Sequence, residues 1–201
     1  MELTAICSIH TGFTTRARLE PAQNGGMPMI QLGDISADGR VDFHRLTRIN
    51  RDDILDRHLV RTGDVVFRSR GDRNTAVALD ESFEEPALAV LPLMILRPNL
   101  DVATPQYLAW AINQPTSQRH FDSTAYGTKM RMVPRTALEQ LQIDVPDMAT
   151  QHQILAIDAL AERERALAIL AAEKRRTLAA LILGNLASLA GSGTGLERNT
   201  N

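Results

Sequence analysis

The segment GTKMRMVP at positions 127–134 combines a glycine with two cations, Lys129 and Arg131. It is followed by LQIDVP at 141–146, in which apolar and polar residues alternate as they do in a short strand. Prolines are absent from Thr150 onward, and Ala, Leu, Glu and Arg dominate as far as Ala190, a composition that favours a helix. A glycine loop, a short strand and a long helix are therefore expected in this order.

Three earlier segments extend the series: Gly12 in a loop, IQLGDI at 30–35 and TGDVVF at 62–67. In their order and spacing, these segments resemble one half of the specificity subunit of a type I DNA restriction-modification enzyme. The resemblance covers nearly the whole chain. Full-length members of that family hold two target-recognition domains and two such helices, so the resemblance implies a half-length form with a single target-recognition domain.

We therefore expect an α+β protein with three parts. A globular target-recognition domain, with a twisted β-sheet and short helices, should occupy residues 1–148. One long C-terminal dimerising helix should occupy 149–190. The Gly, Ser, Thr and Asn residues of 191–201 have the composition of a linker, which predicts a disordered tail.

Local patterns predict the smaller elements of the globular part. Strands are expected around Ile30, at 65–67 and at 141–145. Pro92 interrupts the apolar segment 87–96, which favours a bulged or edge strand there.

Helix signals occur at three places before the long helix. Asn50 can cap a helix that ends at Gly63, and Thr104 with Pro105 can open another that ends before Pro115. Thr136 and Glu139 have the spacing of a capping box, which predicts one helical turn before the strand at 141–145.

The long helix carries an apolar stripe. At 1.5 Å per residue, about forty residues span about 60 Å, more than a domain of this size can cover. The helix must fold back on its own domain or pair with a second copy in an antiparallel coiled coil. We favour the second, because Lys174 and Asn185 interrupt the stripe as register-setting residues do. Alternatively, Gly184 and Asn185 end one helix and start another. The expected dimerisation residues are Leu160, Leu167, Leu170, Leu178, Leu181, Ile182 and Asn185.

The net charge of −2 and the pI near 6.2 argue mildly against a nucleic-acid ligand. Arginines nevertheless crowd residues 40–73, while the acids of 80–101 lie outside that segment in the sequence. Arginine codon usage in a GC-rich genome is an alternative explanation. Cys7 is the only cysteine, so neither an intramolecular disulfide nor a cysteine-based zinc site can form. With no signal-peptide pattern and no apolar stretch long enough to cross a bilayer, we expect a cytoplasmic protein.

Given the resemblance, polar and cationic residues in three loops are the candidate contacts to double-stranded DNA. They are Thr15, Arg16 and Arg18; Arg68, Arg70 and Arg73; and Thr128, Lys129 and Arg131. Alternatively, these loops are solvated turns whose arginines pair with nearby acids such as Asp72. Gly12, Gly33, Asp34, Gly63 and Asp64 are better interpreted as residues of scaffold turns.

No catalytic pattern was found. The five histidines are scattered without metal-ligand spacing, and no nucleotide-binding glycine loop occurs. We therefore expect no enzyme activity, no metal and no cofactor on this chain. The resemblance implies a homodimer and partner methyltransferase (modification) subunits that bind S-adenosylmethionine, with the restriction subunit as a further candidate. One alternative is a protein-binding adaptor that pairs with such subunits without reading DNA. An enzyme that gathers His44 or His58 with the aspartates at 52, 53 and 56 around a metal is another.

Overall fold

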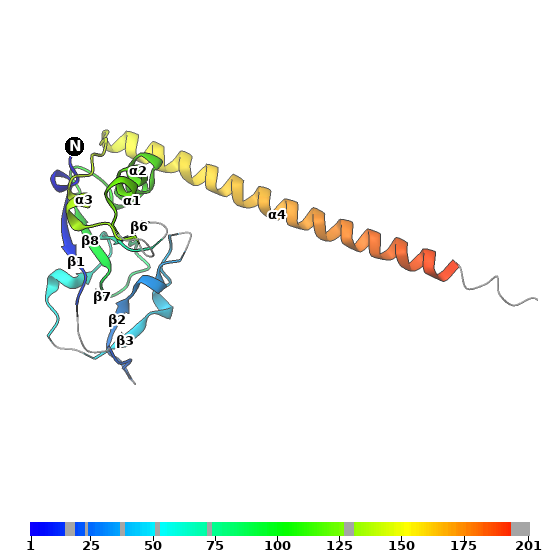
Figure 1. Cartoon of the computed structure of the whole chain (residues 1–201), viewed down its shortest axis with the longest axis horizontal. Coiled ribbons are helices and arrows are strands. Elements are labelled where there is room, and N and C mark those ends of the chain that lie inside the picture. Colours follow the sequence, from blue (N-terminus) through cyan, green and yellow to red (C-terminus); the bar gives the residue numbers. More distant parts are fainter. Residues whose placement is uncertain are drawn as a thin grey trace, which may run out of the picture. The chain divides into compact units, whose positions relative to one another are not determined.

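The structure, a computed structural model, describes residues 1–14, 19–22, 24–36, 39–50, 53–71, 74–126 and 131–193, with side chains as far as Leu189. The chain divides into two compact units, Met1–Leu155 and a second unit that begins at Ala156. Within its described residues, the first unit contains two four-stranded sheets and three short α-helices (Figure 1). The α+β class expected from the sequence is confirmed.

The first sheet is antiparallel throughout. In spatial order its strands are β1 (Cys7–Thr11), β8 (Leu93–Pro98), β5 (Val65–Arg68) and β6 (Ala76–Ala78). Alternate side chains of β5 enter different cores: Val65 and Phe67 join one cluster, and Val66 joins another. The buried run predicted at 65–67 is thus a strand with both faces covered.

The second sheet is mixed. Its strands, in spatial order, are β3 (Thr47–Ile49), β2 (Met27–Ile30), β7 (Ala87–Ala89) and β4 (Leu59–Val60), and the β2–β7 pair is parallel. Ile30, Ala87 and Ala89 share a buried cluster with Val66 and Ile95 of the first sheet. The two sheets therefore share an apolar core.

Helices cover the other face of the first sheet. They are α1 (Pro105–Asn113), α2 (Pro115–Thr124) and α3 (Arg135–Glu139). Phe121 of α2 is fully buried against Phe67 of β5, with ring centroids 5.2 Å apart. Thr104 caps α1 as predicted, because its Oγ1 accepts a hydrogen bond from the Tyr107 amide at 3.1 Å. In Figure 1 the three helices gather on one side of the unit, away from β2 and β3.

Three local predictions were wrong. Residues 50–63 contain no α-helix within their described part, but a short 3-10 turn, η4 (Asp56–His58), followed by β4. The segment around Pro92 is two strands, β7 and β8, each with a neighbour on both sides. The segment 141–145 makes only an isolated bridge, from Gln142 to Glu2. The turn of helix before it is confirmed, but Pro134 is its N-cap and Glu139 accepts from Arg135 instead of closing a capping box.

The helix α4 (Met148–Gly193) confirms the long C-terminal helix and continues through Gly184 and Asn185 without a break. Its first turns belong to the first unit, where Ile154 and Leu155 pack against the core. Gln151 is fully buried there, and its amide bonds to three main-chain groups. The part of the predicted tail from Thr194 to Asn201 lies outside the described residues.

Candidate nucleic-acid interface

Two of the three loops predicted to contact DNA meet in space, although about sixty residues separate them. The Val133 amide donates to the Ser69 carbonyl at 2.8 Å, and the Gly71 amide donates to the Arg131 carbonyl at 3.2 Å. Met132 forms antiparallel bridges with both Arg70 and Tyr126. We call Arg70, Gly71, Tyr126, Arg131 and Met132 the two-loop surface.

Buried polar side chains next to this surface anchor the main chain of the loop after β5. Ser69 is completely buried, and its hydroxyl donates to the Pro92 carbonyl at 2.5 Å. The Asn74 amide group donates to the Arg68 carbonyl at 3.0 Å, and Gln118 of α2 donates to the Asn74 carbonyl at 2.9 Å. Because these bonds fix main-chain atoms at both ends of the loop after β5, the surface has a defined geometry.

The two-loop surface presents two cations and an aromatic ring to solvent. Arg70 and Arg131 are exposed, and Tyr126 is 56 % exposed. The Arg131 guanidinium pairs with Asp122 of α2, with Nη1 and Oδ1 2.9 Å apart. An ion pair this exposed contributes at most about 1 kcal/mol. Nη2 of Arg131 also donates to the Asp122 carbonyl at 2.6 Å, so a phosphate ligand would compete with both contacts.

Arg68 has a different environment from Arg70. Its side chain is half-buried, its Nη1 donates to the Ile35 carbonyl at 3.3 Å, and its Nε is a buried donor without a hydrogen-bond partner among the described residues. The guanidinium therefore reaches the segment that follows β2. Its assignment as a DNA contact stays a prediction.

Sequence reasoning did not assign Tyr126 or Asp122 to the site. Tyr126 carries a sequence signal, since an aromatic residue directly before a glycine loop is suited to stacking on a ligand. Asp122 carries none, because its contact with Arg131 depends on the fold. The remaining candidates Thr15, Arg16, Arg18, Arg73, Thr128 and Lys129 lie outside the described residues.

In the structure, acidic side chains neutralise part of the positive charge of the arginine-rich segment. Arg48 pairs with Glu85 at 2.7 Å, and this hydrogen-bonded pair holds the pKa of Glu85 below its ordinary value. Arg61 pairs with Asp56. Glu85 lies outside the arginine-rich segment in the sequence, but the fold places it against Arg48. Positive and negative charges that are separated along the chain are therefore neighbours on the surface here.

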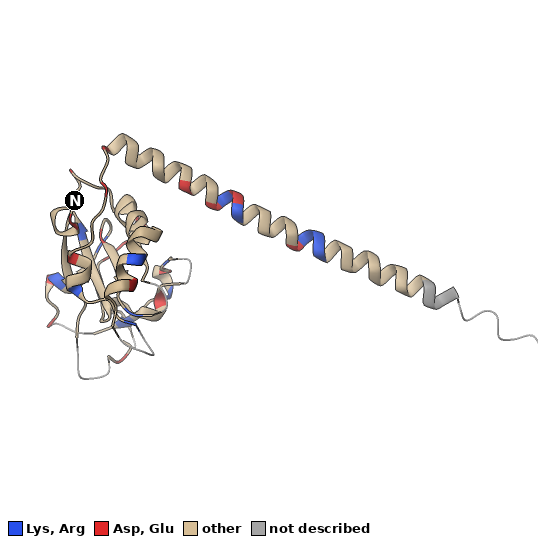
Figure 2. Ribbon diagram, turned by 45° about the horizontal axis from the view of Figure 1, so that its top comes forward, with Lys and Arg blue, Asp and Glu red and all other residues tan. Residues whose placement is uncertain are grey.

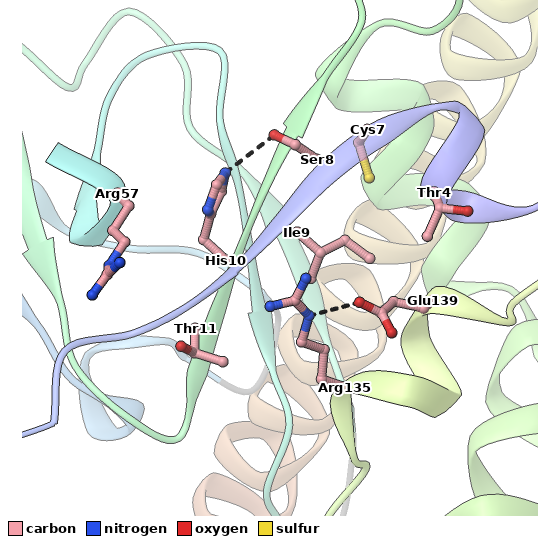
Figure 3. A pocket seen from close by; sticks show the side chains of 9 residues that line it. All are labelled: Thr4, Cys7, Ser8, Ile9, His10, Thr11, Arg57, Arg135 and Glu139. Carbon is pink, nitrogen blue, oxygen red and sulfur yellow. Dashed lines mark hydrogen bonds and ion pairs between the residues drawn. The ribbon is translucent and has the colours of Figure 1, made fainter.

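A pocket of about 510 Å³ runs along β1 (Figure 3). The Ser8 hydroxyl and Nε2 of His10 lie 3.2 Å apart beside it, and Arg57 and Arg135 line it. Burial, and then the positive charges of Arg97 and Arg135 among others, lower the pKa of His10. Burial also raises the pKa of the Cys7 thiol to about 12, so this thiol is protonated at neutral pH.

This pocket does not provide a catalytic triad. Among the described residues no carboxylate bonds to His10, and Glu139 instead accepts a hydrogen bond from Arg135 at 2.7 Å. No group of three His, Cys, Asp or Glu side chains suited to a metal ion occurs in the described part of the chain. His58 bonds to the Thr11 carbonyl through Nδ1 at 3.0 Å.

The predicted dimerisation residues all lie exposed on α4. Leu160 is 68 % exposed and Leu181 is 63 % exposed. Charges on this helix occur at Asp158, 162–165 and 173–176, and the turns from Thr177 to Leu189 carry none (Figure 2). None of the helices in the described ranges combines the length and apolar character that a membrane crossing requires.

The fold described here is that of the specificity subunits of type I restriction-modification systems. One similar chain comes from structural work on complex assembly and conformational transition of the type I R-M system (TM-score 0.63, 20 % identity, covering 90 % of this chain and 42 % of that chain). The HsdS subunit from Thermoanaerobacter tengcongensis gives a TM-score of 0.56 at 21 % identity, covering 83 % of this chain and 38 % of its own. The type I S subunit from M. genitalium gives 0.52 at 14 % identity, covering 84 % and 40 %.

This chain thus spans about two fifths of the length of each of these proteins. No family model matches the sequence, and no curated protein matches it significantly.

Proposed function

We propose that this chain is a non-catalytic, sequence-specific DNA-recognition subunit of a type I restriction-modification system, in a half-length form with one target-recognition unit. The observation that carries the proposal is the two-loop surface, where Arg70, Tyr126 and Arg131 are exposed on loops joined by main-chain hydrogen bonds. The planar guanidinium fork suits both phosphate oxygens and the edge of guanine. Buried polar side chains fix the main chain of the loop that carries Arg70, which supports reading of a duplex in a defined register.

In this proposal two copies pair through α4 and present identical surfaces to the two half-sites of an interrupted palindrome. The pair docks modification subunits, which bind S-adenosylmethionine and carry the chemistry, and through them the restriction subunit. Such a complex acts in the cytoplasm. The exposed apolar residues of α4 support a partner along this helix, because exposed apolar patches of this extent mark interaction surfaces.

Selection of bound sequences from random duplex DNA tests the proposal. The purified chain, alone and with its modification subunit, should enrich a gapped palindrome. Arg70→Ala should weaken binding. If Arg70 contacts a phosphate, the slope of the logarithm of affinity against the logarithm of salt concentration should become shallower by about 0.9. Arg45→Ala, which removes an exposed arginine outside the two-loop surface, is the matched control and should bind as the wild type does.

If no sequence is enriched in either mixture, the DNA-recognition proposal fails. The protein would then be an adaptor that binds such subunits without reading DNA, a role that suits its net charge of −2. Retention of the chain by the modification subunit without DNA enrichment would identify that adaptor.

A further inference from the structure

The second unit leaves a helix face uncovered. Every described side chain from Ala156 to Leu189 is exposed, and the large apolar ones include Ile157, Leu160, Leu167 and Leu178. A helix with such a face is stabilised by packing against another apolar surface. The pattern of residues on this face identifies what that surface is.

Two rows of residues, each with a seven-residue repeat, make up the face. One row is Ile157, Glu164, Ala171, Leu178 and Asn185, and the other is Leu160, Leu167, Lys174 and Leu181. The two rows alternate at spacings of three and four residues, as the core positions of a coiled coil do. Only Glu164, Lys174 and Asn185 are polar.

The face matches the same face of a second, antiparallel helix when Ile169 of one copy lies level with Ile169 of the other. Residues equally far before and after that level then face each other. Ile157 meets Leu181, Leu160 meets Leu178, and Leu167 meets Ala171. Glu164 meets Lys174, so each charge interrupting the face meets its opposite, and by symmetry this happens twice.

The flanking positions agree with this register. Leu170 lies beside its own symmetry mate near the centre, and Ala168 does the same on the other flank. Asn185 falls opposite Gln153, another exposed amide of α4. Other charged residues, such as Glu162 and Arg165, form a surface ion pair at 3.1 Å within one helix.

Competing arrangements leave the two charges unsatisfied. Within the described helix, neither Glu164 nor Lys174 forms an ion pair, so both are available to a partner. Sliding the second helix by seven residues in either direction places Glu164 and Lys174 opposite apolar side chains. A parallel pair places glutamate against glutamate and lysine against lysine, and such like-charge contacts disfavour an interface.

We propose that α4 pairs with a second copy of this chain in an antiparallel coiled coil centred at Ile169, with Glu164 of each copy facing Lys174 of the other. This inference rests on the proposed function, since it specifies the homodimer named there. The two charged layers select the register and the antiparallel direction, and the leucine layers supply the buried apolar area.

Charge reversal in the full-length chain tests the register. Glu164→Lys places two lysine pairs in the dimer, and Lys174→Glu places two glutamate pairs, so each variant should self-associate more than about tenfold more weakly. An equimolar mixture of the two variants, and the double variant, should regain the wild-type dimer mass in light scattering. Glu162→Lys, on the outer face, is the control and should stay dimeric.

Cysteine cross-linking tests the direction independently. In a Cys7→Ala background, a mixture of Leu160→Cys and Leu178→Cys chains should form an intermolecular disulfide. Neither variant should do so alone, because the two copies of residue 160 lie about 27 Å apart, far beyond the reach of about 7 Å for a disulfide. A disulfide in Leu160→Cys alone would identify a parallel pair and overturn the proposal.

The outcomes separate this proposal from the proposed function. Single charge reversals that stay fully dimeric would overturn the register but leave the homodimer and DNA recognition in place. A wild-type chain that stays monomeric alone and with its modification subunit would overturn the self-pairing. DNA recognition is judged separately, by the enriched sequences.

Discussion

Replacing Gln151 by leucine should lower the unfolding free energy of the first unit strongly. This fully buried side chain joins the start of α4 to residues 102–104 and to Pro146. Its Oε1 accepts from the Thr104 amide at 3.0 Å, and its Nε2 donates to the carbonyls of Val102 and Pro146, each at 2.9 Å. Leucine has a similar size but no hydrogen-bonding group. One amide and two carbonyls of half-buried residues would lose their partner.

Each lost hydrogen bond of this kind costs about 1 kcal/mol, and more where the group left behind stays dry. The free energy of unfolding should therefore fall by about 3 kcal/mol, roughly a 150-fold change in the folding equilibrium constant. Urea unfolding followed by the fluorescence of Trp110, the only tryptophan and a residue of α1, measures this change. α1 begins just after the Thr104 amide that would lose its partner.

Gln106→Leu is the matched control, since it makes the same change at an exposed position of α1 that lies outside the pairing rows of α4. It should alter the unfolding free energy by less than about 0.5 kcal/mol, as substitutions on open surface do. A loss below about 1 kcal/mol for Gln151→Leu would refute the reasoning, because the three hydrogen bonds would then not hold the start of α4 in place.

Three further predictions concern other parts of the chain. Gly12→Ala should lower the unfolding free energy by about 1–3 kcal/mol, because a Cβ there would lie 2.8 Å from the Val90 carbonyl carbon, whereas Gly33→Ala, with open space around it, should be nearly neutral in the same denaturation assay. The double variant Lys129→Ala, Arg131→Ala should weaken DNA binding in a mobility-shift assay without changing the mass in solution. A chain cut after Leu155 should instead lose the dimer mass and stay folded. A loss of mass in the double variant would mean that the dimer contact is misplaced. Stability should fall as pH drops below about 6.5, since the lowered pKa of His10 means that the unfolded state binds the proton more readily, and His10→Gln should flatten that part of a pH series of unfolding midpoints.

Signals confined to a few neighbouring residues predicted structure well. Thr104 and Pro105 mark the start of α1 because a side-chain cap and a proline in the first turn act locally. The long helix was predictable for a similar reason: its alanines and leucines favour a helix at every position.

Contacts between distant residues account for the errors. Leu55 and Leu59 have helical spacing, but Leu59 pairs with Leu88 of β7 instead, and Val60 pairs with Ala87. Pro92 suggested an edge strand, yet the chain changes sheets there, and both flanking strands find neighbours on each side. Leu141 and Ile143 are buried as their alternation predicted, but their main-chain bonds go to Leu3 and Met1 and form no ladder.

The candidate site was predictable in part. Both loops could be selected from the sequence, because each combines a glycine with cationic residues. It held no sign that they touch, since that contact is made by main-chain atoms of residues 69–71 and 131–133. Nor did it indicate that Arg68 is half-buried beside Ile35 while Arg70 is exposed.

The main-chain character of this junction has a consequence for how the protein can diversify. The bonds between Val133 and Ser69 and between Gly71 and Arg131 use only amide hydrogens and carbonyl oxygens, so they do not depend on which side chains stand at positions 70 and 131. Only proline at 71 or 133 would remove a donor. Side chains at the exposed positions can be exchanged while the platform beneath them is inherited unchanged, and new ligand preferences can arise on it without a new fold.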